Sequence, residues 1–219
     1  MIHLGMFAKY WEAGSVKTRL AAAIGDAAAS RIYFHGLSSM LDRFASLAEI
    51  RTLVYWPSAH LDEFTKLAGP AWQLVPQTTG DLGNRIKNYF EAAFQNGASR
   101  VVLIGSDSPT VPRDWIRQSW QMLEQSNVVL GPSSDGGYYL VGMSQFAPAI
   151  FDNIRWSSAF VLTDTQSRIA EQGLSVAQLP AWYDIDIVDD LHRLRRELAT
   201  QPPADTDWTN LIAAIDDVI

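Results

Sequence analysis

The residue whose position most favours chemistry is Asp107, a lone acid that follows a short apolar run. The segment 101–111 reads VVLIGSDSPTV, so four apolar residues lead into Gly105, Ser106 and then Asp107. A short, unbroken and largely β-branched run bounded by turn residues predicts a strand buried on both faces, as in a parallel sheet. In open α/β sheets a ligand binds beyond the carboxyl ends of the strands, and Asp107 falls there. The alternative is that Asp107 and Ser108 only cap the next helix.

A second acid, Asp135, lies in a glycine-rich stretch. The segment 133–143 reads SSDGGYYLVGM and follows a strand expected over 127–132. Gly136 and Gly137 admit positive φ and let a ligand approach the backbone closely. Because Asp-Gly is also a common hairpin signal, a simple hairpin turn is the alternative.

Four acids fall within the segment 183–190, YDIDIVDD. Asp189 and Asp190 directly precede a helical pattern, and the helix dipole explains them. Asp184 and Asp186 come earlier and alternate with a single isoleucine, so both can face the same side of an extended segment. These two acids are therefore the ones that we consider for a site.

Cations gather in the segment 9–19, KYWEAGSVKTR, directly after the first expected strand. Loops in this place bind phosphates through backbone amides, a helix amino terminus and basic side chains. GSVKT is not a Walker A motif, because its lysine does not follow the second glycine of the required spacing. Ordinary solvated loop charge is the alternative for Lys9, Lys17 and Arg19.

The segment 78–85, TTGDLGNR, precedes a helical pattern that begins at Ile86. Taken alone, Asp81 is best interpreted as a helix cap and Arg85 as an ordinary residue of the first turn.

Together these side chains fit one chemical need. Hard carboxylate oxygens bind Mg²⁺ or Mn²⁺, usually through one or two carboxylates, with phosphate oxygens and water completing the shell. Lysine and arginine then hold the rest of a diphosphate. Other chemistries lack their motifs: the chain has no cysteine, its four histidines are scattered, and neither a GxSxG elbow nor a GxGxxG fingerprint is present.

The elements that would position these residues alternate between strand and helix, which predicts an α/β fold with right-handed crossovers. Strands are expected over 2–8, 51–56, 72–76, 127–132 and 138–143 and from Val101, and helices over 61–67, from 86, over 115–123, around 191–198 and around 208–219. The apolar periodicity over 18–47 predicts two further helices, which Gly25 and Asp26 separate. We expect the helix around 191–198 to end at Pro202 and Pro203.

Composition sets wider limits. The chain has 219 residues and a net charge of −7, which argues against a general nucleic-acid or anionic-membrane surface. No apolar run approaches the roughly 20 residues that a membrane helix needs, and the segment MIHLGMFAKYW shows neither a basic leader nor a small-residue cleavage site. We expect a cytoplasmic protein with one domain over 1–219.

The motifs also resemble a known family. FAKYWEAGSVKTRLA, GDLGNR, VVLIGSDSP, VLGPSSDGGYYLVG, IRWSS and DIDIVDDL occur in this order and cover most of the first 191 residues. They resemble the bacterial glycosyltransferase-like DUF2064 group, some of whose members are called radical-SAM/selenodomain-associated transferase 1. The resemblance implies a three-layer nucleotide-diphospho-sugar transferase (GT-A) fold with a mostly parallel, mixed central sheet. More distantly, the group is similar to guanylyl- and cytidylyltransferases.

The resemblance implies that Lys17 and Arg19 bind nucleotide phosphates, that Asp107 and Asp186 hold Mg²⁺ or Mn²⁺, and that Asp135 faces the acceptor or sugar. Together with the residue patterns, it gives a candidate site. Its members are Lys9, Lys17, Arg19, Asp81, Arg85 and Ser106 for the nucleotide; Asp107, Asp186 and Asp184 for the metal ion; Asp107 and Asp135 for catalysis; and Gly136, Gly137 and Tyr138 for the acceptor or sugar.

This chain departs from the family pattern in its first loop. Trp11 and Ala13 stand where the family usually has prolines, and Ser15 replaces a frequent lysine. We expect a less preordered loop with one cation fewer. GSDSP also carries one acid where many glycosyltransferases have DxD, so a metal site depends more on Asp184 and Asp186.

Three functions remain open at this stage. The first is metal-dependent glycosyl transfer from a nucleotide sugar to a small-molecule acceptor. The second is nucleotidylyl transfer, in which a nucleoside triphosphate reacts with a phosphorylated acceptor and releases pyrophosphate. The third is nucleotide binding without catalysis, which the altered first loop motivates. The residues leave the base, the sugar, the acceptor and the oligomeric state open.

Overall fold

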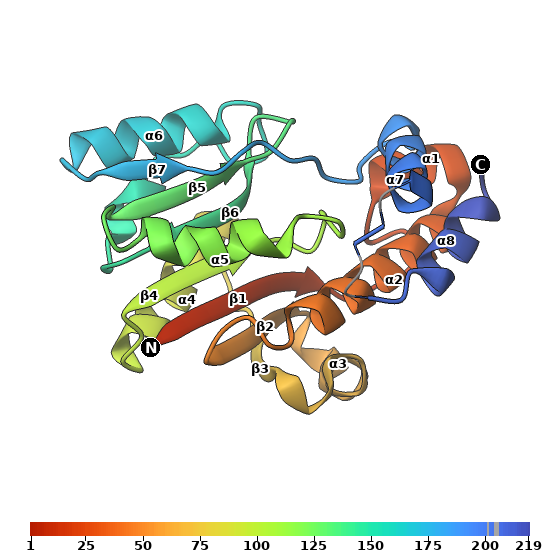
Figure 1. The fold of residues 1–219 in the computed structure, drawn as a ribbon, viewed down its shortest axis with the longest axis horizontal. Coiled ribbons are helices and arrows are strands. Elements are labelled where there is room, and N and C mark those ends of the chain that lie inside the picture. The colour runs from red at the N-terminus through yellow and green to blue at the C-terminus, as the bar shows by residue number, and fades with distance from the viewer. Residues whose placement is uncertain (201, 204–205) are drawn as a thin grey trace.

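A central mixed sheet organises the computed structural model, which describes residues 1–200, 202–203 and 206–219 (Figure 1). Within the described chain the sheet has seven strands in the order β3-β2-β1-β4-β6-β5-β7. Neighbouring strands are parallel except that β6 runs antiparallel to both β4 and β5. The strands are β1 (Ile2–Lys9), β2 (Ile50–Trp56), β3 (Gln73–Pro76), β4 (Arg100–Ile104), β5 (Val128–Pro132), β6 (Tyr138–Met143) and β7 (Val176–Gln178).

Helices cover both faces of the sheet. They are α1 (Thr18–Ile24), α2 (Asp26–Phe44), α3 (Leu61–Ala68), α4 (Leu82–Gln95), α5 (Arg113–Met122), α6 (Val161–Glu171), α7 (Val188–Thr200) and α8 (Thr209–Asp216), with short 3₁₀ turns η1 (Ser58–His60), η2 (Gly69–Ala71) and η3 (Pro148–Phe151). In Figure 1, α5 crosses in front of the sheet and α4 lies behind it.

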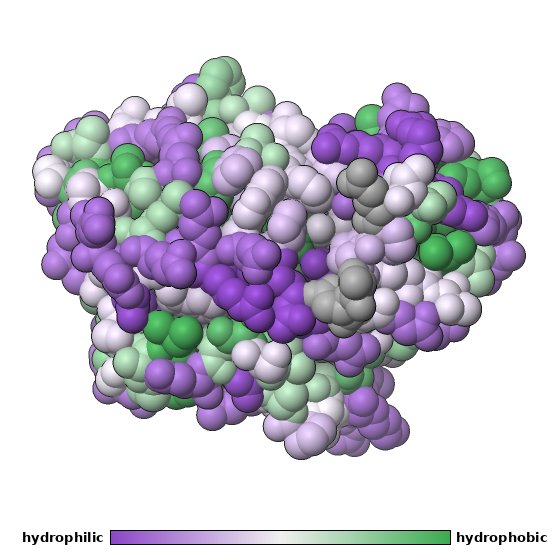
Figure 2. Space-filling model, viewed as in Figure 1, coloured by the Kyte–Doolittle hydropathy of each residue, from purple (hydrophilic) through white to green (hydrophobic). Residues whose placement is uncertain are grey.

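The central strand β4 shows why the sheet is buried on both sides. Its side chains alternate, so Val102 and Ile104 join the core beneath α2, α3 and α5, whereas Val101 and Leu103 join the core beneath α4, η3 and α6. The prediction of a strand buried on both faces is confirmed. The outer face of α5 is polar, and Figure 2 shows a hydrophilic band across the middle of this view, where α5 lies in Figure 1.

A third core lies beside the sheet, where α1, α7 and α8 pack on the amino-terminal part of α2 (Figure 1). Leu20, Ile32, Leu194 and Ile215 are all buried there. Because this core holds α7 against α1 and α8, it brings the segment before α7 close to the carboxyl ends of β1 and β4.

The α/β class with a mostly parallel, mixed sheet is confirmed, and each expected helix and strand forms within a few residues of its predicted bounds. The Asp135 turn is a hairpin turn, because it joins the antiparallel pair β5 and β6. The apolar sequence of β4 predicted a strand within a parallel sheet. In the structure β4 has one parallel neighbour, β1, and one antiparallel neighbour, β6. None of the described helices is long and apolar enough to cross a membrane.

Candidate active site

The carboxyl ends of β1 and β4 border a cleft of about 740 Å³. Register explains the opening: β1 pairs with β4 only as far as Met6 and Ile104, after which the chain of β4 turns away while β1 continues to Lys9. The loop before α1, the start of α4, the turn between β5 and β6, the loop before α6 and the segment 184–186 supply the other walls. The cleft therefore lies where open α/β sheets bind their ligands.

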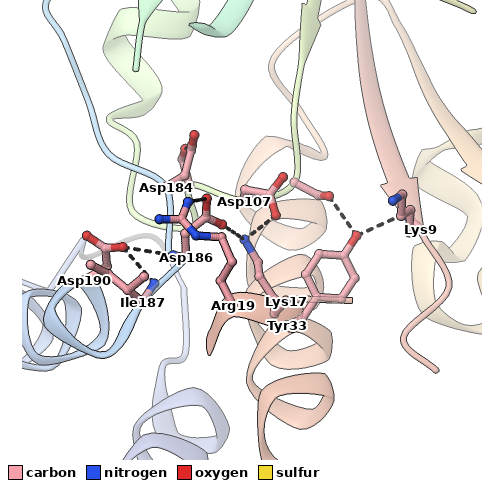
Figure 3. Close-up of polar contacts among 11 residues, drawn as sticks. Lys9, Lys17, Arg19, Tyr33, Asp107, Asp184, Asp186, Ile187 and Asp190 are labelled. Carbon is pink, nitrogen blue, oxygen red and sulfur yellow. Dashed lines mark hydrogen bonds and ion pairs between the residues drawn. The ribbon is translucent and has the colours of Figure 1, made fainter. Parts of the chain in front are cut away.

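Lys17 is the centre of an ion-pair cluster in this cleft (Figure 3). Its ammonium contacts the Asp107 carboxylate and lies 3.3 Å from Oδ1 of Asp186. Only 6% of the Lys17 side chain is exposed. Burial alone would lower the lysine pKa, but the charges of Asp107 and Asp186 outweigh it and raise the pKa above its usual value. Lys17 is therefore positively charged and lies between two acids.

Asp186 is held by the amino terminus of α7. The backbone N–H groups of Asp186 and Ile187 both donate to Oδ2 of Asp190 at 3.0 Å (Figure 3). One residue earlier, the backbone N–H of Ile185 donates to the Asp107 carbonyl at 3.0 Å. Asp190, which sequence analysis left to the helix dipole, thus also orders the backbone that carries Asp186. On the solvent side, Nη1 of Arg19 is 3.5 Å from Oδ2 of Asp186.

Asp184 faces a different partner. The Ser108 hydroxyl donates to Oδ1 of Asp184 at 2.5 Å. Burial, followed by the nearby charge of Asp107, raises the pKa of Asp184 to about 6. The alternation of Asp184 and Asp186 does bring both to the cleft, but Asp184 is directed to Ser108 while Asp186 is directed to Lys17.

A helix residue that sequence analysis did not single out, Tyr33 of α2, links two strand ends. The backbone N–H of Lys9 donates to the Tyr33 oxygen at 3.0 Å, so the phenol hydrogen is free to donate to Ser106 Oγ at 2.8 Å. Burial and the charge of Asp107 raise the pKa of Tyr33 to about 12, which keeps the phenol protonated. Lys9 itself is exposed and lines the cleft with Ser106.

The turn between β5 and β6 forms another wall. Oδ1 of Asp135 accepts hydrogen bonds from the Ser133 hydroxyl and, at 2.9 Å, from the backbone N–H of Gly137. Asp135, Gly137 and Tyr138 line the cleft, whereas Gly136 is not among its lining residues. Gly136 has φ +91°, and a Cβ there would lie 2.3 Å from a backbone oxygen of the loop before α6. Its conformation therefore serves the packing of the turn.

The residues of the GDLGNR stretch differ in role, because Asp81 caps a helix whereas Arg85 lines the cleft. Asp81 caps α4 by accepting from the Asn84 backbone at 2.8 Å, and it is not among the lining residues of the described chain. Arg85 does line the cleft. Its guanidinium donates to the Gly80 carbonyl at 2.9 Å and to the Gln77 side chain at 3.3 Å.

The loop before α6 also forms part of the wall, although none of its residues was among the predicted site residues. Trp156 lies there against Gly83 of α4, where a Cβ would come within 2.8 Å of the indole nitrogen. The only sequence signal was the IRWSS stretch, which contains Trp156. Gln77 and Ser133 are further lining residues that lacked a distinctive pattern.

The residues present suit a hard divalent ion. Asp107 and Asp186 both direct carboxylate oxygens at one point, which the Lys17 ammonium occupies. Among the residues that the structure describes, no group of three or more histidines or acids forms a ready metal cage. Mg²⁺ commonly takes only one or two protein carboxylates and obtains its remaining ligands from phosphates and water. The donor set therefore fits an ion that binds together with a phosphorylated ligand.

The fold and the position of the cleft define the class of protein. A solved structure of a candidate nucleotide-diphospho-sugar transferase from Desulfovibrio desulfuricans G20 matches with a TM-score of 0.91 and 35% identity, over 99% of this chain and 97% of that one. A cytidylyltransferase from Leptospira borgpetersenii serovar Hardjo-bovis matches with a TM-score of 0.57 and 13% identity, over 99% of this chain and 94% of that one. A manganese complex of Rv0371c from Mycobacterium tuberculosis H37Rv matches with a TM-score of 0.53 and 17% identity, over 88% of this chain and 96% of that one. The fold is that of nucleotide-diphospho-sugar transferases.

The family DUF2064, described as uncharacterized protein conserved in bacteria, matches residues 40–158. The chain belongs to this family, as the order of its motifs predicted. A comparison with curated proteins finds no match.

Proposed function

We propose that the chain is a transferase that uses a nucleotide-activated donor, and that it transfers a glycosyl group from a nucleotide-diphospho-sugar to a small-molecule acceptor. The observation that supports this most is the cluster of Lys17, Asp107 and Asp186 in a cleft of about 740 Å³ at the carboxyl ends of β1 and β4. A diphosphate needs a fixed cation, and its metal ion needs hard carboxylates. The resemblance to the transferase from Desulfovibrio desulfuricans adds support.

The donor phosphates bind next to the loop before α1. Lys17 and Arg19 supply the positive charge, and Lys9, Arg85 and Ser106 line the same cleft. Ser106 is oriented by Tyr33, so its hydroxyl has a set position at the end of β4. Asp81 acts through α4, because its side chain caps that helix and orders the turn that leads to Arg85.

Asp107 and Asp186 are the residues that would hold Mg²⁺ or Mn²⁺. When bound there, the ion neutralises charge that develops on the diphosphate leaving group. Asp184 remains a candidate ligand, and its hydrogen bond from Ser108 holds the loop that carries Asp107.

Asp135 faces the acceptor. Hydrogen bonds from Ser133 and Gly137 converge on its Oδ1 and fix the carboxylate at the cleft wall. A carboxylate in this position can accept the proton of an attacking hydroxyl group. Gly137 and Tyr138 extend the same wall, whereas Gly136 packs against the loop before α6.

Nucleotidylyl transfer is the second candidate. It is favoured by the single acid of GSDSP, because Asp107 stands alone at the end of β4, and by the likeness of the fold to a cytidylyltransferase. The same residues would then hold a nucleoside triphosphate, and pyrophosphate would leave.

Phosphorus NMR of the products distinguishes the two reactions. The protein is incubated with Mn²⁺ and pooled metabolites, together with either nucleotide sugars or nucleoside triphosphates. We expect nucleoside diphosphate to form from a nucleotide sugar, and an Asp107→Asn variant to abolish this. Asp114→Asn is the control, because Asp114 lies on the exposed face of α5 and pairs only with Arg117 among the described residues. Pyrophosphate release from triphosphates would favour the second candidate, and no turnover of either kind would leave nucleotide binding without catalysis.

A further inference from the structure

Lys17 occupies the point that a divalent ion takes in the proposed function. Its ammonium contacts Asp107 and lies 3.3 Å from Asp186, so one side chain bridges both proposed ligands. Figure 3 shows the ammonium between the two carboxylates. The inference below rests on the proposed function, because it takes Asp107 and Asp186 as metal ligands.

The position of Lys17 is imposed by its surroundings. Its backbone has φ 50° and ψ 41°, in the left-handed region that residues other than glycine rarely adopt. The neighbouring Val16 is buried, and the Lys17 carbonyl accepts from the Ala21 backbone at 2.8 Å, which anchors the residue at the start of α1. A backbone outlier persists only where the surrounding structure determines it, and such outliers cluster at functional sites.

The Lys17 ammonium and a divalent ion cannot both lie between the carboxylate oxygens of Asp107 and Asp186, because both are positively charged. Two cations a few ångströms apart in a partly buried cleft repel strongly. Without a ligand, however, Lys17 offsets the negative charges of Asp107, Asp184 and Asp186. Arg19 cannot replace it, because 68% of its side chain is exposed and, among the described residues, it pairs only with Asp186.

We propose that Lys17 is an exchangeable internal cation. In the free protein it joins Asp107 to Asp186 and excludes a divalent ion. When a diphosphate arrives, its phosphate oxygens draw the ammonium away from the carboxylates and open the position between them. The divalent ion and the diphosphate therefore bind together, and neither binds strongly alone.

The test is a Mn²⁺ titration without nucleotide, followed by the electron paramagnetic resonance signal of free Mn²⁺. Lys17→Met removes the charge and keeps most of the side-chain volume. We expect this variant to bind Mn²⁺ at least about tenfold more tightly than the wild type, since a competing charge has been removed. Lys66→Met is the matched control and should change the affinity by less than about threefold, because Lys66 is exposed on α3 and does not line the cleft.

A wild-type measurement gives a second readout. Inorganic pyrophosphate serves as the diphosphate probe in thermal unfolding. Mn²⁺ and pyrophosphate together should raise the melting temperature of the wild type by clearly more than the sum of their separate effects. Lys17→Met should lose this excess, because Mn²⁺ alone already stabilises the variant.

Circular dichroism first tests whether Lys17→Met is folded. If Lys17→Met is unfolded, Lys17→Gln replaces it and is judged by the same criteria. If the folded variant binds Mn²⁺ no more tightly than the wild type does, the proposed exchange of Lys17 is wrong. In that case an Asp107→Asn variant separates the two ideas: if it abolishes wild-type Mn²⁺ binding, the proposed metal site stands without the exchange. If Asp107→Asn has no effect, or if no variant binds Mn²⁺ either alone or together with pyrophosphate, both ideas are wrong.

Discussion

At the scale of single residues, the mouth of the cleft depends on one phenol. The Tyr33 oxygen accepts from the Lys9 backbone and contacts Ser106, so one side chain of α2 ties the ends of β1 and β4 together. This contact lies where β1 continues beyond its last pair with β4.

We expect Tyr33→Phe to lower the free energy of unfolding by about 1–2 kcal/mol, because the Lys9 backbone N–H loses its acceptor and Ser106 loses a partner. Tyr10→Phe removes the same atom from a tyrosine whose hydroxyl has no hydrogen bond to another described residue, and should change stability by less than about 0.5 kcal/mol. Urea unfolding measures both. Equal effects of the two substitutions would contradict the role given to Tyr33.

His3 predicts a pH dependence of stability. Burial lowers the pKa of His3 to about 4, and its Nδ1 is buried without a hydrogen-bond partner. The unfolded chain therefore takes up a proton near pH 6.5, before the folded protein does. Stability is lost as the pH falls from about 6.5 to about 4, by at most about 3 kcal/mol, and this loss levels off at lower pH.

The measurement compares urea unfolding at about pH 7 and about pH 4.5 for the wild type, His3→Gln and His192→Gln. The loss on acidification should be smaller in His3→Gln, whose amide can still bond Thr52, the partner of the His3 ring at 2.8 Å. His192 is exposed, so its substitution should leave the wild-type pH dependence in place. If His3→Gln loses as much stability on acidification as the wild type does, His3 is not the cause of the pH dependence.

The residue types at strand ends predicted Asp107 as a site residue, and the order of the motifs predicted Lys17 and Asp186. All three line the cleft. Tyr33 was beyond such reasoning, since a tyrosine on an apolar helix face looks like a core residue, and its polar contacts come from strands far away in the sequence. Asp184 illustrates another limit. Alternation correctly predicted a shared segment, but only the position of Ser108 decides which partner the side chain finds.

At the scale of elements, the amino terminus of α7 positions Asp186. Asp190 in the first turn accepts from two backbone N–H groups, including that of Asp186, whereas the neighbouring Asp189 is exposed. The two acids are adjacent and identical, yet only Asp190 is bonded to the segment that carries the proposed ligand.

We expect Asp190→Ala to cost about 1 kcal/mol of stability, as for the loss of a helix cap, and to weaken Mn²⁺-dependent nucleotide binding because Asp186 loses its fixed backbone. Asp189→Ala should do neither beyond a few tenths of a kcal/mol. Urea unfolding and calorimetric titration give the two readouts. If both variants bind like the wild type, the positioning role of Asp190 is wrong.

Two elements were not predicted, α6 and β7. In α6 the inward-facing positions include Thr165 as well as Val161 and Ile169, so a polar residue interrupts the apolar period. The edge strand β7 has only three residues and pairs with β5 alone, which leaves too little pattern to recognise. Both are held by tertiary contacts more than by local preference.

At the scale of the whole molecule, strand order was the feature that local patterns could not give. The pairing of β6 with β4 joins residues far apart in the chain, and it brings the Asp135 turn to the same cleft as Asp107. The third core has a similar effect, because it folds α7 and α8 back onto α1 and α2. The prediction that residues 1–219 form one domain stays a prediction.

The central claim is that the cleft binds a nucleotide diphosphate and a divalent ion through Asp107. The most direct test is thermal unfolding of the wild type and Asp107→Asn with nucleoside diphosphates and nucleotide sugars, each with and without Mn²⁺. For one nucleotide we predict a stabilisation that requires Mn²⁺, of about 2.7 kcal/mol at a hundredfold excess over the dissociation constant. Asp107→Asn should remain folded and lose this stabilisation, while Asp114→Asn should keep it. An undiminished shift in Asp107→Asn, or no shift with any nucleotide in the wild type, would contradict the account.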